Sequence, residues 1–108
     1  MRFRIYDFYM FKQVHLYIKG DIIGVGFRAW TKIQAKIIGV TGWVRNVFNN
    51  PQVFGAGGGV EVLIQGDEEK LEKILTVLKQ GPPVSQVDDV EVFWQDAKEI
   101  IEGFEIRK

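Results

Sequence analysis

A short glycine-rich segment, GDIIGVG at residues 20–26, is the feature that most restricts how this chain can fold. Before it, residues 14–19 alternate apolar and more polar side chains, which is the period of a half-buried strand. After it, Phe27 to Ile38 contains no glycine or proline, and Gly39 stands where a helix would end. A strand, a tight loop and a helix are therefore predicted to follow one another directly.

The rest of the chain repeats this alternation. Asp67 is a good N-cap for a second helix, which Gly81 and two prolines would end. Between residues 46 and 59, a turn-rich segment is unusually long for a hairpin loop. Further strands are expected at residues 40–46, 60–65, 87–94 and 103–107.

This order predicts an α+β fold of the ferredoxin-like, split βαβ type, β-α-β-β-α-β, with an antiparallel sheet, two helices on one face and room for a small extra strand. The first helix has an apolar stripe through Phe27, Thr31 and Ala35. Ile33 and Ile37 lie beside this stripe, and we expect them in the core; the alternative is an outward-facing interaction patch.

Composition bounds the possible functions. The 108 residues, 46% of them apolar, suffice for one core, which we assign to residues 14–108, with an N-terminal extension at residues 1–13. That extension is expected to add a strand or helix; an interfacial or partner-binding arm is the alternative. Fourteen basic residues balance fourteen acidic ones, so neither a nucleic acid nor a membrane is an expected partner.

Several classes of site are disfavoured by residue counts. The chain has no cysteine, which excludes disulfides, thiolate catalysis and thiolate metal sites, and its one histidine, His15, argues against a zinc site. We expect no metal and no cofactor. His15 alternates with core positions, so it is predicted on the open face of the sheet. Charges interrupt the apolar N-terminus before a signal peptide or membrane span could form, and we expect a cytoplasmic monomer.

The glycine loop suits an anion. A loop that opens a helix turns several backbone N–H groups toward one concavity, where the helix N-terminus adds partial positive charge. Arg28, in the first helical turn, could grip two phosphate oxygens. The spacing matches neither the nucleotide P-loop nor the dinucleotide fingerprint. The alternative is that Gly20, Gly24 and Gly26 only make a tight turn and that Arg28 is a solvated surface charge.

Three segments, in the same order along the chain, resemble the motifs of a known protein family. GDIIGVGFR, then TGWVRN at residues 41–46, then FEIR at residues 104–107 resemble the acylphosphatase family, whose usual loop reads G-x-V-Q-G-V-x-F-R. The resemblance implies the ferredoxin-like fold. It also implies a phosphate-binding arginine, Arg28, and a water-orienting asparagine, Asn46. The implied phosphate cradle is the backbone of Gly20, Asp21, Ile22, Ile23, Gly24, Val25, Gly26 and Phe27.

The implied reaction hydrolyses a small-molecule acyl phosphate to a carboxylate and inorganic phosphate. Its leaving group is already good, so positioning and electrostatic stabilisation can supply most of the catalysis. A related domain begins larger carbamoyl-transfer maturation proteins. Because this chain ends at Lys108, we expect a stand-alone enzyme.

Three departures from the family pattern bear on activity. Ile23 replaces the usual glutamine, and Asp21 puts a carboxylate where a neutral or basic residue is common. The segment between Asn46 and Val60 is about eight residues longer than the usual turn and could cover or distort the site. The rival hypothesis is accordingly a non-catalytic anion-binding or regulatory module that keeps the fold.

Overall fold

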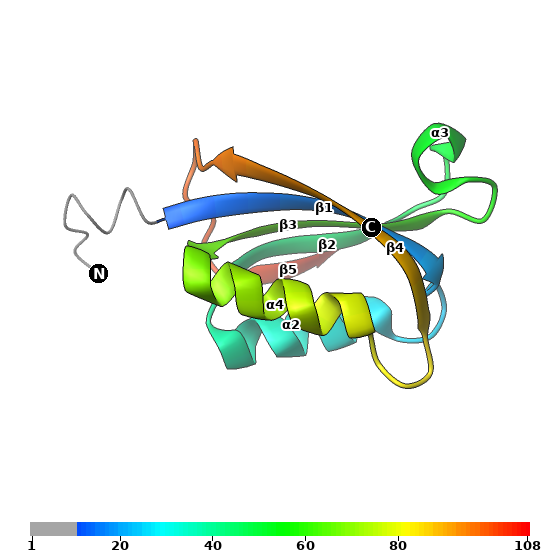
Figure 1. Ribbon diagram of the computed structural model, residues 1–108, viewed down its shortest axis with the longest axis horizontal. Helices are drawn as coiled ribbons and strands as arrows, with labels where there is room; N and C mark the ends of the chain where they lie inside the picture. Colours follow the sequence, from blue (N-terminus) through cyan, green and yellow to red (C-terminus); the bar gives the residue numbers. More distant parts are fainter. Residues whose placement is uncertain (1–10) are drawn as a thin grey trace.

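The computed structural model describes residues 11–108, which form one sheet with two long helices packed against one of its faces (Figure 1). Within these residues the sheet has five strands in the order β4-β1-β3-β2-β5. In chain order the elements are β1 (Phe11–Asp21), α2 (Phe27–Ile38), β2 (Thr41–Val47), α3 (Pro51–Phe54), β3 (Gly59–Asp67), α4 (Glu68–Gln80), β4 (Gln86–Asp96) and β5 (Phe104–Arg107).

The predicted ferredoxin-like order is confirmed, with β5 as the extra strand. One correction concerns the sheet, which is mixed and not wholly antiparallel, because β5 pairs parallel to β2. The cause lies in the loop of residues 97–103, which reverses the chain after β4 and carries it to the opposite edge of the sheet. Since β4 is antiparallel to β1, the reversed β5 runs in the direction that β1 and β2 share.

Strand β1 begins at Phe11, three residues before the predicted start of the domain. Strand β3 pairs with Phe11, and both β3 and β4 pair with Lys12 and Gln13. All three residues therefore belong to the sheet. The predictions for the first ten residues of the extension lie outside the described residues. No helix in residues 11–108 is long and apolar enough to cross a membrane.

Helix α2 has the predicted bounds. Gly26 before it and Gly39 after it both have left-handed backbone conformations, with φ of 78° and 91°. Its stripe of Phe27, Thr31 and Ala35 is buried against the sheet and α4.

The core prediction for Ile33 and Ile37 is wrong, since these side chains are 55% and 73% exposed. Each helical residue advances about 100° around the axis, so Ile33 points about 200° away from Thr31. Ile37 is related to Ala35 in the same way. Both isoleucines therefore face solvent.

Helix α4 begins as predicted. The Lys70 backbone N–H donates to the Asp67 carboxylate over 2.9 Å, which satisfies one of the free N–H groups at the helix start. The buried side chains of α4 face the side chains at even-numbered positions of β1. Together they belong to the core between helices and sheet: Leu71, Ile74, Leu75 and Leu78 from α4, and Val14, Leu16 and Ile18 from β1.

The long segment after β2 folds away from this core. It contains the one-turn helix α3, which lies on the side of the sheet opposite α2 and α4 (Figure 1). Phe54 of α3 is buried and meets Tyr17 of β1 edge to face, with ring centroids 5.6 Å apart. His15 lies on this same open face, as predicted, half-buried beside Tyr17.

Candidate active site

The glycine-rich segment begins at an irregularity in the sheet. The register between β1 and β4 shifts between Lys19 and Gly20, and Gly20 packs directly against the backbone of Gln86 and Asp88. Beyond Asp21 the chain leaves the sheet and turns through residues 22–26 into α2. The loop is thus fixed at one end by strand pairing and at the other by the first turn of a helix.

A cavity of about 160 Å³ opens where this loop meets the ends of β2 and β5. This space is large enough for several water molecules, so a phosphate group can enter it. The start of α2 faces it, which places unpaired backbone N–H groups at its wall. The cavity is lined by Ile22, Gly24, Gly26, Phe27, Arg28, Ala29, Asn46 and Ile106.

Arg28 supplies the positive charge at this cavity. Its Nη1 donates to the Arg107 carbonyl oxygen of β5 over 3.3 Å, which ties the guanidinium across the end of the sheet. Its side chain forms no ion pair within residues 11–108. Arg28 as a residue is half-buried, and the remaining donors of its guanidinium are available for an anion.

Asn46 reaches the cavity from β2. It follows Gly42 and Val44 at two-residue spacing, so its side chain lies on the helix-covered face of the sheet. In the part of the chain that the structure describes, no protein group hydrogen-bonds its side-chain amide. An amide carries both donors and an acceptor, so it can orient a water molecule beside the bound anion.

Only part of the predicted cradle lines the cavity: Ile22, Gly24, Gly26 and Phe27 do, whereas Gly20, Asp21, Ile23 and Val25 do not. Gly20 and Asp21 still belong to β1 and pair with β4. Ile23 packs beside Gly58, and Val25 packs against the core. No residue of the long segment 47–59 lines the cavity, although Gly58 of this segment packs against Ile23 of the loop.

Two cavity residues were not among the predicted site residues. Ala29 lies one position after Arg28, and Ile106 belongs to β5. The FEIR segment was the available signal for Ile106, but its place beside the loop depends on a pairing of β5 with β2 that local pattern does not indicate. Within residues 11–108, no group of three or more His, Cys, Asp and Glu side chains is arranged to hold a metal ion.

Comparisons with known proteins point to one family. The Acylphosphatase family model matches residues 14–106. An acylphosphatase from Pelotomaculum thermopropionicum is 39% identical over 94 residues, which cover 87% of this chain and 94% of the relative. An acylphosphatase from Thermococcus kodakarensis is 40% identical over 94 residues, with coverage of 87% and 93%.

A solved structure extends the similarity to three dimensions. The crystal structure of an acylphosphatase from Bacillus subtilis aligns with a TM-score of 0.79 at 30% identity and covers 90% of this chain and 99% of that one. The matched region contains the loop, Arg28 and Asn46. This protein therefore belongs to the acylphosphatase family.

Proposed function

We propose that this protein is a cytoplasmic, monomeric acylphosphatase, which hydrolyses the carboxyl–phosphate anhydride of a small acyl phosphate. Water would attack phosphorus, the bond from phosphorus to the carboxyl oxygen would break, and the products would be a carboxylate and inorganic phosphate. The observation that carries this proposal is the single cavity in which the glycine loop, Arg28 and Asn46 meet.

Arg28 and the loop N–H groups would stabilise the phosphoryl group during transfer. Phosphoryl transfer passes through a loose transition state in which charge is spread over the equatorial oxygens. Donors that are already in place around those oxygens need no reorganisation when the charge develops. The Arg28 guanidinium, held toward β5 by the Arg107 carbonyl, is such a donor.

Asn46 would hold the attacking water in line with the breaking bond. An amide is a poor base, so Asn46 only orients the water. The proton that the attacking water loses goes to the phosphate oxygens of the substrate. The leaving carboxylate is stable without protonation, so the reaction needs no general acid. This division of work predicts activity that does not depend on an added metal.

The test is hydrolysis of benzoyl phosphate by purified protein in the presence of excess chelator. We expect turnover above the spontaneous rate, unchanged when the chelator is added. A protein that binds inorganic phosphate but gives no turnover would be a non-catalytic anion-binding module, and the proposal would be overturned.

A further inference from the structure

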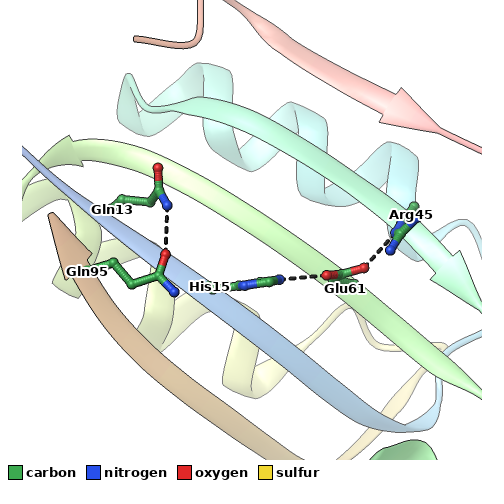
Figure 2. Close-up of polar contacts among 5 residues, drawn as sticks. All are labelled: Gln13, His15, Arg45, Glu61 and Gln95. Atoms are coloured by element: carbon green, nitrogen blue, oxygen red, sulfur yellow. Dashed lines mark hydrogen bonds and ion pairs between the residues drawn. The ribbon is translucent and has the colours of Figure 1, made fainter. Parts of the chain in front are cut away.

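On the open face of the sheet, behind Asn46, a buried carboxylate joins three strands (Figure 2). Glu61 of β3 is 7% exposed. One carboxylate oxygen accepts from Arg45 Nε of β2 over 2.5 Å, and the other lies 2.6 Å from His15 Nε2 of β1. Figure 2 shows the three side chains in a row across the strands.

This cluster is costly to disturb. A carboxylate taken out of water is tolerated when its oxygens are paired and hydrogen-bonded, and both oxygens of Glu61 are engaged. Arg45 and Glu61 are also direct cross-strand partners in the β2–β3 ladder. The ion pair therefore reinforces the backbone pairing at this position.

At the C-terminal end of β2, Asn46 is the first residue that pairs with a neighbouring strand on one side only. Strand β5 pairs with β2 only as far as Arg45, so Asn46 and Val47 are held by β3 alone. After Val47 the chain leaves the sheet for the long segment that carries α3. The last position of β2 that is tied on both sides is thus Arg45, the direct neighbour of Asn46.

We infer that Glu61, acting through Arg45, is a positioning residue for Asn46. The ion pair between Glu61 and Arg45, which we call the clamp, fixes the end of β2 from the open face. The Asn46 amide on the other face therefore keeps its direction into the cavity. Neither Glu61 nor Arg45 lines the cavity, so neither contacts the phosphate site. This inference rests on the proposed role of Asn46 in hydrolysis.

Glu61→Gln removes the charge and keeps the shape of the side chain. We expect kcat for benzoyl phosphate to fall between roughly tenfold and a hundredfold, as small misplacements of a positioning group do. The inhibition constant of inorganic phosphate should change by less than about twofold, because the loop and Arg28 are untouched. Arg45→Lys should retain more activity than Arg45→Met.

Gln65→Met is the matched control. Gln65 lies on the same strand and face as Glu61, is 1% exposed and bonds Gln13, the Glu99 carbonyl and the Ile101 N–H, but it is at the other end of the sheet from Asn46. It should lose stability while kcat stays near the wild-type value. A kcat within twofold of wild type in Glu61→Gln, or an equal loss in Gln65→Met, would overturn the inference.

A second readout does not depend on turnover. NMR order parameters of the Asn46 and Val47 backbone should fall below the rigid value of about 0.85 in Glu61→Gln and not in Gln65→Met. If the wild type shows no turnover, the proposed function fails, and unchanged order parameters would separately overturn the clamp. If Glu61→Gln does not fold, Arg45→Met, whose side chain is 46% exposed, takes its place in both measurements.

Discussion

Replacing Gly20 and Gly26 by alanine, one at a time, should reveal two different reasons for glycine in the loop. At Gly26, φ is 78° and an added methyl group would meet no atom within 4 Å, so only the left-handed backbone is penalised, by about 1–2 kcal/mol. At Gly20, an added Cβ would overlap the Gln86 carbonyl oxygen and lie 2.9 Å from the Asp88 nitrogen. These are backbone atoms of β4, so β1 and β4 would have to separate. We expect a loss of at least about 3 kcal/mol.

Thermal unfolding measures the difference. One kcal/mol shifts the melting temperature of a domain near this size by about 4–8 °C, so Gly26→Ala should lower it by roughly 4–16 °C and Gly20→Ala by at least about 12 °C. Gly26→Asn should cost less than Gly26→Ala, because asparagine tolerates the left-handed region. Equal losses at the two positions, or a larger loss at Gly26, would refute the assignment of Gly20 to strand packing.

Two further predictions concern the anion. Inorganic phosphate should raise the melting temperature, since a ligand at a hundredfold excess over Kd adds about 2.7 kcal/mol to the stability of the native state; no rise at inhibitory concentrations would place the anion outside a folded-state site. Asp21 is exposed and, within residues 11–108, its carboxylate makes no ion pair. At roughly 8 Å from a phosphate dianion the Asp21 carboxylate would repel the anion by about 1 kcal/mol in water, which is roughly fivefold in affinity, and screening near 0.15 M salt would reduce this to a few tenths of a kcal/mol. Asp21→Asn should therefore lower KM by about fivefold at low salt and by less than about twofold near 0.15 M salt. A higher KM together with lower stability would make Asp21 structural.

The sequence predicts best where local chemistry decides the outcome. Helix α2 has its expected bounds because glycines at both ends adopt conformations that other residues resist. The start of α4 follows from a single side chain, since Asp67 caps it. The alternation in β1 likewise indicates which side chains face the helices.

What escaped prediction depends on packing between distant segments. The parallel pairing of β5, the contribution of Ile106 to the cavity and the fold of the segment around α3 all require knowing which strand edges meet. The exposure of Ile33 shows a different difficulty: an apolar residue was assigned to the core although the stripe through Thr31 already pointed the other way. The meeting of Arg28 and Asn46 at one cavity was anticipated only through the family resemblance.

The most direct test of the account is a comparison of kcat and phosphate inhibition between Arg28→Ala and Asn46→Ala, with benzoyl phosphate as substrate. Lys36→Ala, which removes an exposed cation from the last turn of the same helix, is the control for Arg28. Arg28→Ala should lose both turnover and inhibition by phosphate, because its guanidinium would contact ground state and transition state alike. Asn46→Ala should keep inhibition by phosphate and lose mainly kcat. Equal loss of phosphate affinity in both variants, or full activity in either, would contradict the proposed division between phosphate binding and water orientation.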